Sequence, residues 1–342
     1  MPNNPKNNQI NIINHHLLNQ TDMKKVNYLF LAAAALTLAA CNNNEDEMSG
    51  PVAAHITAGI GAPQTRAVGS SWNADHIGVS VTAAPNSEME TLYRNVEYST
   101  AATGTVAAEF TAVSGGIFFQ DATETVTFSG YAPYQSALTG NTIDVDTQTN
   151  NGNSQEDIDF LFAAGATASR SNPTVIFTDN STSGGTDCSF HHMMAQLNIV
   201  FQTSTTDGFA ASDILDADNT FNLGGLTHEG TFDVTDGGTA VTGTAVASWD
   251  ITACKHTDAN NQRTYSLILL PQDLTATALN VSVVIGGQTY SNTADVKPNL
   301  EAGYSYTYTI TVKKTGLAVS GCTISNWVNG TGGSGDAVMP QS

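Results

Sequence analysis

The sequence has few charged residues, and basic ones are especially scarce. Only 12% of its 342 residues are charged, about half the usual share, and 11 Lys and Arg stand against 31 Asp and Glu. So acidic a chain repels nucleic acid and anionic lipid, and we expect no nucleic-acid partner. Thr, Ser, Asn and Gly replace the charged side chains, and this composition is typical of extracellular β-proteins.

The sequence also lacks an apolar run long enough for a membrane-spanning helix. Its main apolar stretch, residues 28–38, is shorter than the roughly 20 residues that a bilayer span needs. Two lysines precede it and small residues follow it, which is the layout of a signal peptide. The ending Leu38-Ala39-Ala40-Cys41 resembles a lipobox. We therefore expect residues 1–40 to be cut off between Ala40 and Cys41, and Cys41 to be lipidated. Translation could start at Met1 or at Met23.

Residues 41–50 are expected to form a lipidated acidic tether. Three asparagines and then three acids follow Cys41, and we expect so polar a segment not to pack. The acids resemble the export tag that sends some Gram-negative lipoproteins to the outer face of the outer membrane. An ordinary flexible tether is the alternative.

Cysteine is scarce too, with four in the whole chain. Once Cys41 carries lipid, Cys188, Cys254 and Cys322 remain, so at most one intramolecular disulfide can form. Their spacing does not suit a metal site, and we favour buried free thiols while leaving the disulfide state open.

Catalytic motifs are missing from the sequence. It has no Gly-x-Ser-x-Gly elbow, no phosphate-binding loop and no His-Glu-x-x-His. His191 and His192 are adjacent, so on a strand their side chains point to opposite faces and cannot easily share a metal ion. The pairs Asp144/Asp146 and Asp157/Asp159 are interpreted as surface or loop acids. We expect no enzyme activity, no cofactor and no metal.

What the sequence does contain is alternation with a period of two residues. Tyr304, Tyr306 and Tyr308 share one face of a strand with Ile310 and Val312, and residues 279–285 form a hairpin with 288–292 through Gly286-Gly287. Residues 210–216 give at most a turn or two of helix. Further strands are predicted at 77–82, 125–131, 142–146, 174–178, 195–203, 230–234, 246–251, 265–270 and 317–327.

These short strands predict an all-β protein built from antiparallel sandwiches. Its length favours two domains. A loop-like region around residues 164–173 is the predicted boundary, which gives an N-terminal domain over 51–168 and a C-terminal domain over 169–342 with a short Gly-rich tail.

Seven short patterns along the chain resemble the fimbrillin family, the subunits of the type V pili of Gram-negative anaerobes of mouth and gut. They span nearly all of the expected mature chain. In order, they are Trp72–Val79, Tyr131–Tyr134, Asp159–Ala163, Phe190–Ile199, Leu269–Gln272, Leu300–Tyr306 and Ile324–Trp327.

The resemblance implies two transthyretin-like β-sandwich domains, export as a lipoprotein, and polymerisation by strand exchange. It places the maturation cut of an arginine-specific or trypsin-like protease between Arg66 and Ala67. The strand displaced after this cut would be residues 55–60, with Ile56, Ala58 and Ile60 facing the core. The donor strand would lie in the tail, whose one apolar group is Ala337-Val338-Met339.

The expected partners are other pilus subunits, the processing protease, the lipoprotein export machinery and, before cleavage, the outer membrane. The expected location is the cell surface and then an extracellular pilus that mediates adhesion. The alternative is a lipid-anchored glycan-binding protein with an exposed aromatic platform. Tyr304, Tyr306, Tyr308 and Trp327 could form one, although core packing is favoured for them. Tip, stalk and anchor roles, the receptor and the identity of the protease stay open.

Overall fold

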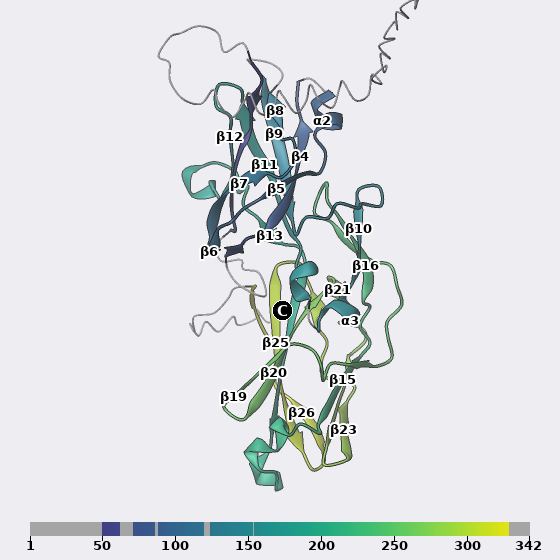
Figure 1. Ribbon diagram of the computed structural model, residues 1–342. Helices are drawn as coiled ribbons and strands as arrows, with labels where there is room; N and C mark the ends of the chain where they lie inside the picture. Colours follow the sequence, from purple (N-terminus) through teal and green to yellow (C-terminus); the bar gives the residue numbers. More distant parts are fainter. Residues whose placement is uncertain (1–49, 62–70, 86–87, 120–123, 153, 328–342) are drawn as a thin grey trace, which may run out of the picture. The chain divides into compact units, whose positions relative to one another are not determined.

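The computed structural model describes residues 50–61, 71–85, 88–119, 124–152 and 154–327 (Figure 1). The described residues from Val52 onward belong to one compact unit. They form many short strands and only a few single-turn helices, so the all-β prediction is confirmed. In this part of the chain no helix is long and apolar enough to cross a bilayer.

Two sheets enclose the core of the C-terminal half. Alternating apolar residues of β14 and β25 point into it, as the sequence pattern predicted. The larger sheet has the order β19 (His256–Ala259), β20 (Gln262–Leu269), β14 (Ala195–Thr203), β25 (Tyr304–Lys313) and β26 (Gly316–Val319), and β27 (Thr323–Asn326) also pairs with β25. The smaller sheet has the order β18 (Trp249–Asp250), β15 (Thr220–Gly224), β22 (Asn280–Ile285) and β23 (Gln288–Asn292).

One eight-stranded sheet bounds the core of the N-terminal half. Its order is β12 (Thr174–Phe177), β2 (His55–Gly59), β7 (Ala107–Ala112), β5 (Val96–Ser99), β4 (His76–Ala83), β9 (Thr125–Ala132), β11 (Leu161–Ser169) and β13 (His191–His192). Two short pairs flank it, β1 (Val52–Ala53) with β8 (Phe118–Phe119) and β3 (Trp72–Asn73) with β6 (Thr103–Thr105).

A third, smaller core joins the two halves. It contains Tyr131 and Phe160 from the first half and Phe232 and Trp327 from the second, and the Phe160 and Phe232 rings stack with centroids 4.5 Å apart. The strands beside it are β10 (Thr142–Asp146), β16 (Glu229–Asp233) and β17 (Thr239–Val241), with β21 (Gln272–Asp273) and β24 (Asn299–Leu300) as a further pair.

The helices are short and lie between strands. They are α2 (Glu88–Leu92), α3 (Thr147–Asn150) and the 3-10 turns η1 (Gln155–Asp157), η2 (Ser181–Ser183), η3 (Thr205–Asp207) and η4 (Ala211–Leu215). The last of these is the predicted turn of helix near residues 210–216.

Three details of the strand prediction are wrong. Of residues 246–251, only Trp249–Asp250 form a strand. Residues 164–169 are not a loop, because they belong to β11 and pair with β9. This Ala- and Gly-rich segment has low strand propensity, and its pairing partners decide its conformation. Residues 317–327 form two strands, β26 and β27, which pair with opposite ends of β25 and are separated at Ser320–Cys322.

The division into domains at residues 168 and 169 stays a prediction. Strands pair across it at three places, one of them between Leu161–Phe162 of β11 and β13. Strand β10, from the predicted first domain, pairs with β16, and β12, from the predicted second domain, pairs with β2.

Candidate functional site

The first candidate site is the position in the fold that the N-terminal segment, residues 52–61, occupies. This segment is called here the N-terminal strand; it includes β1, which pairs with β8, and β2, which lies inside the eight-stranded sheet between two neighbours. Strand β2 runs antiparallel to β7, with Ile56 opposite Phe110, and parallel to β12, with Ile56 opposite Val175. Both edges of β2 are therefore paired.

The side chains of the N-terminal strand alternate as predicted. Ile56, Ala58 and Ile60 are buried, with 2%, 0% and 8% of their surface exposed, whereas His55 is exposed and Thr57 is half-buried. Burying the two isoleucine side chains contributes roughly 3–6 kcal/mol. Burial of this inward face therefore contributes much of the free energy that holds the segment in the sheet.

Aromatic rings form the floor beneath these side chains. Trp72 is fully buried, and its ring meets those of Phe110 and Phe190 edge-on at centroid distances of 5.1 and 5.4 Å. Its indole Nε1 donates a hydrogen bond to the Ala58 carbonyl oxygen over 2.9 Å. Without the N-terminal strand, this floor would become an apolar slot that carries an unpaired donor.

Main-chain hydrogen bonds fix both ends of the N-terminal strand. The amide of Ala54 donates to the Ile117 carbonyl at 2.8 Å, and the Ile117 amide in turn donates to the Tyr98 hydroxyl at 3.0 Å. Burial raises the pKa of Tyr98 to about 12, so this hydroxyl is neutral. At the other end the Gly61 amide donates to the Phe190 carbonyl at 3.1 Å.

Gly61 packs closely against Ser189 at this end of the strand. A Cβ atom there would lie only 2.4 Å from Ser189 Oγ, so a larger residue would push this hydroxyl away from its bond to Asp187. A strand that replaced this segment would therefore fit best with a glycine here, or if it ended before this position.

The other residues predicted for lipidation, cleavage and donation lie outside the described residues. They are Ala40, Cys41, Arg66, Ala67, Ala337, Val338 and Met339. Arg66 belongs to the stretch 62–70, which joins the N-terminal strand to β3.

Most of the predicted aromatic platform is buried. Tyr306, Tyr308 and Trp327 expose 3%, 5% and 1% of their surface, so core packing is confirmed for them, and only Tyr304 is exposed, at 39%. These four residues cannot present a continuous sugar-stacking surface.

The adjacent histidines have separate partners, as expected for opposite faces. His191 Nε2 lies 3.1 Å from a carboxylate oxygen of Asp187, whereas His192 Nδ1 lies 2.7 Å from Asp159 Oδ1. The side chains of His192 and Asp159 are fully buried, and the His192 ring stacks on Trp327 at 4.3 Å. Asp159 lies in the loop between η1 and β11, but a surface position is wrong for it, because this buried carboxylate holds a buried imidazole at the junction of the two halves.

The three cysteines are free thiols. Cys188 and Cys254 are buried, and Cys322 is half-buried. Burial raises the pKa of Cys254 to about 11, which makes its thiol unreactive.

Side-chain amides cover the part of the β20 edge that β19 leaves unpaired, an arrangement that no local sequence pattern predicts. Strand β19 pairs with β20 only from Gln262 to Tyr265. Beyond it, the Asn151 side chain donates to the Ile268 carbonyl at 2.7 Å and accepts from the Ile268 amide at 2.7 Å. Gln155 Nε2 donates to the Ser266 carbonyl at 2.6 Å. We call Asn151 and Gln155 the amide seal.

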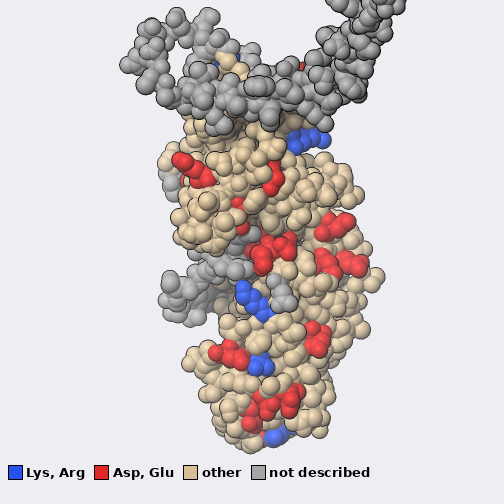
Figure 2. Space-filling view, in the orientation of Figure 1, with Lys and Arg blue, Asp and Glu red and all other residues tan. Residues whose placement is uncertain are grey.

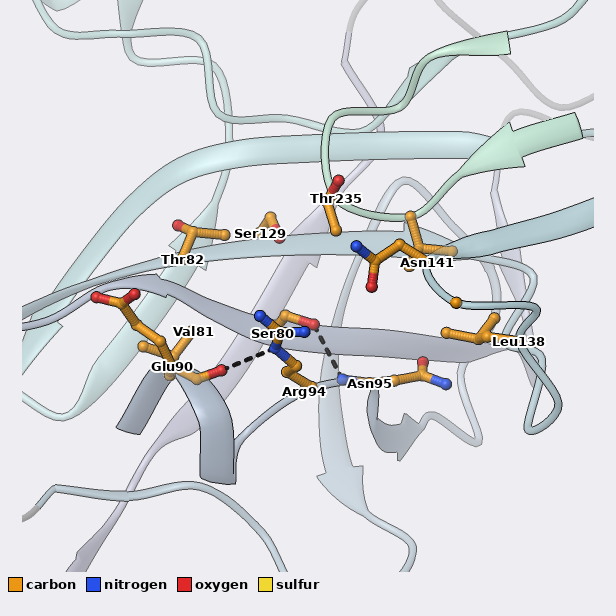
Figure 3. A pocket seen from close by; sticks show the side chains of 12 residues that line it. Ser80, Val81, Thr82, Glu90, Arg94, Asn95, Ser129, Leu138, Asn141 and Thr235 are labelled. Atoms are coloured by element: carbon orange, nitrogen blue, oxygen red, sulfur yellow. Dashed lines mark hydrogen bonds between the residues drawn. The ribbon is translucent and has the colours of Figure 1, made fainter. Parts of the chain in front are cut away.

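Sequence reasoning also missed a polar cleft on the outer face of β4 and β9 (Figure 3). It has a volume of about 400 Å³, and its lining comes from five separate segments, so no local motif could have revealed it. The lining includes Ser80, Ser129, Arg94 and Asn141.

Comparison with known proteins gives consistent matches over nearly the whole chain. A family model described as fimbrillin-like matches residues 65–327. A Bacteroides uniformis protein provisionally classed as fimbrium subunit Fim1C is 30% identical over 326 residues, which cover 91% of this chain and 98% of that protein.

Two solved structures provisionally classed as cell adhesion proteins share the fold. The one from Bacteroides ovatus has a TM-score of 0.64 and 26% identity, over 82% of this chain and 99% of that one. The one from Bacteroides uniformis has a TM-score of 0.61 and 24% identity, over 83% of this chain and all of that one (100%).

Proposed function

Because the chain belongs to the fimbrillin-like family, a family of fimbrial subunits, we propose that its N-terminal strand is exchanged for a strand of another subunit. In this proposal the precursor is exported as a lipoprotein anchored to the outer membrane through Cys41. A protease then cuts between Arg66 and Ala67, and the subunit joins an extracellular pilus that mediates adhesion.

The observation that carries this proposal is the position of the N-terminal strand. Its main part, β2, pairs on both edges and covers an aromatic floor, yet the chain connects it to β3 only through the stretch that contains Arg66. A cut at Arg66 would therefore leave this strand held by non-covalent contacts alone.

Cleavage changes the competition for the slot. Before the cut, the tethered strand has a high effective concentration, on the order of millimolar or above, and excludes competitors. After the cut, the lipidated fragment can leave. The empty slot would then offer two rows of unpaired backbone groups, on β7 and β12, to a strand of another chain.

The requirements for a donor strand follow from the side chains that it replaces. The donor must place apolar groups at the positions of Ile56, Ala58 and Ile60, two residues apart. In the tail of this chain, Ala337 and Met339 would share one face and Val338 the other. Residues 337–339 would therefore fill at most two of these three inward positions.

The proposal is tested with the purified precursor and limited trypsin treatment. The wild-type chain should yield a product that starts at Ala67 and forms ladders on unheated gels, alone or with donor subunits. Arg66→Gln should block both the product and the ladders, whereas Arg170→Gln, which removes an arginine elsewhere, should change neither. Ladders from the Arg66→Gln protein, or a product starting at Ala67 that never assembles with any partner subunit, would contradict it.

A further inference from the structure

The polar cleft has a floor of hydroxyl groups. Ser80 of β4 and Ser129 of β9 lie directly opposite each other in the sheet, and both line the cleft. The Ser80 hydroxyl accepts a hydrogen bond from the Asn95 amide at 2.9 Å. Ser129 is only 1% exposed, so its contact with the cleft is at the bottom of the cavity. Hydroxyl groups both donate and accept hydrogen bonds, so this floor is suited to bind a polar ligand.

One wall of the cleft carries a guanidinium group. Arg94 Nε donates to the Glu90 carbonyl oxygen at 3.2 Å, which orients the side chain. Its terminal nitrogens have no other partner among the described residues. In Figure 3 the Glu90 carboxylate points away from this guanidinium, and its Oε1 accepts from the Ala84 amide at 3.1 Å. The arginine is therefore available to an incoming anion.

This guanidinium stands out on a predominantly acidic protein. Figure 2 shows acidic side chains spread over the visible face, with fewer basic ones. Arg94 is the one Lys or Arg among the residues that line the cleft. Guanidinium groups bind carboxylates through two parallel hydrogen bonds, which gives orientation as well as affinity.

The opposite wall offers an amide and a hydroxyl. Asn141 and Thr235 lie across the cleft from Arg94 in Figure 3. Leu138, Val81 and Val234 add apolar surface. Donors and acceptors on several sides, with apolar patches between them, match a ring that carries both hydroxyl groups and C–H faces.

We propose that this cleft binds one sugar ring that carries a carboxylate, such as a uronic or sialic acid unit of a glycan. Arg94 binds the carboxylate, and the Ser80 and Ser129 hydroxyls and Asn141 bind ring hydroxyls. In the order of the sheet, β7 and β5 separate the N-terminal strand from β4, so this site is independent of strand exchange. The uncleaved protein should therefore bind as well as the processed one.

The test compares two sugars that differ only in the carboxylate. Methyl glucuronide and methyl glucoside are titrated into the full-length protein and followed by saturation-transfer NMR, with the methyl glycoside of N-acetylneuraminic acid as a second acidic probe. At least one acidic probe should bind saturably and at least tenfold more tightly than methyl glucoside. Its binding should also weaken as salt is raised.

Matched variants assign the binding to the cleft. Arg94→Met should weaken acidic-sugar binding at least tenfold, and Arg170→Met should leave it unchanged. Ser129→Ala, which removes only the hydroxyl, should weaken it severalfold while circular dichroism shows the same fold. The proposal is overturned if neither acidic probe binds, if neutral and acidic sugars bind equally, or if Arg94→Met binds as the wild type does.

Discussion

The two halves of the molecule close an open sheet edge in different ways. In the first half, the gap between β7 and β12 is filled by the backbone of the N-terminal strand. In the second half, β20 extends past β19, and its exposed backbone groups bond to the side chains of Asn151 and Gln155.

This difference determines which edge can exchange. A backbone strand can be replaced by any segment with a suitable alternation of side chains, because its hydrogen bonds are common to all residues. The amide seal depends on two particular side chains in the middle of the chain, both almost fully buried. We infer that the protein directs strand addition to its first half and blocks it at β20.

The largest loss of stability is expected from a charged side chain on the inward face of the N-terminal strand. Ile56→Asp should destabilise the first half by about 4 kcal/mol or more, because it buries an unpaired carboxylate above the aromatic floor. Thr57→Asp, on the outward face of the same strand, should cost less than about 1 kcal/mol. Urea unfolding of the uncleaved protein measures both. Equal losses from the two variants would mean that the strand does not use its inward face.

A somewhat smaller loss of stability is expected when a side chain of the amide seal is removed. Asn151→Ala leaves the amide and the carbonyl of Ile268 without partners, which should cost about 3 kcal/mol. Gln148→Ala, at a nearby exposed position, is the control and should be nearly neutral. Hydrogen exchange followed by mass spectrometry should show faster exchange in β20 and unchanged exchange in β2. Faster exchange in both strands would remove the distinction between the two edges.

The smallest expected effect is a pH dependence of stability that arises near α3, the helix beside the amide seal. His228 Nδ1 lies 2.9 Å from Thr147 Oγ1, and burial lowers the pKa of His228 from 6.5 to about 4. As the pH falls, the unfolded chain therefore binds this proton first, and stability should decrease between about pH 6.5 and 4. The loss should reach about 2–3 kcal/mol.

His228→Gln should flatten this dependence, since glutamine has no proton to gain in that range. Thermal unfolding at several pH values measures the slope, and hydrogen exchange locates the change. The change should appear around α3 and leave the N-terminal strand unaffected. An unaltered slope in the variant would show that another group is responsible.

A strand that buries only one of its faces is predicted well from the sequence. The alternation in residues 195–203 and 304–312 follows from a sheet that packs on one side only, and the inward set of the N-terminal strand follows for the same reason. Strands made of small residues cannot be predicted from alternation in this way. Residues 164–169 contain alanine and glycine, and only their pairing with β9 makes them a strand.

The functional features divide in the same way. Ile56, Ala58 and Ile60 could be assigned from local alternation together with family resemblance. Neither the amide seal nor the cleft could be predicted in this way. Asn151 contacts Ile268, which lies 117 residues away in the sequence. The cleft is lined by Ser80, Arg94 and Asn141, which come from separate segments. Side-chain contacts between distant segments are set by the tertiary fold and leave no periodic signal.

In the proposed assembly, cleavage at Arg66 makes the N-terminal strand exchangeable. Native mass spectrometry of trypsin-cleaved protein, mixed with an isotope-labelled peptide of residues 51–62, measures this directly. We expect the labelled peptide to replace the natural fragment in the cleaved protein, but not in the Arg66→Gln protein. A peptide with aspartate in place of Ile56 and Ile60 should not bind. Retention of the natural fragment by a folded, fully cleaved protein, against excess labelled peptide, would contradict the account.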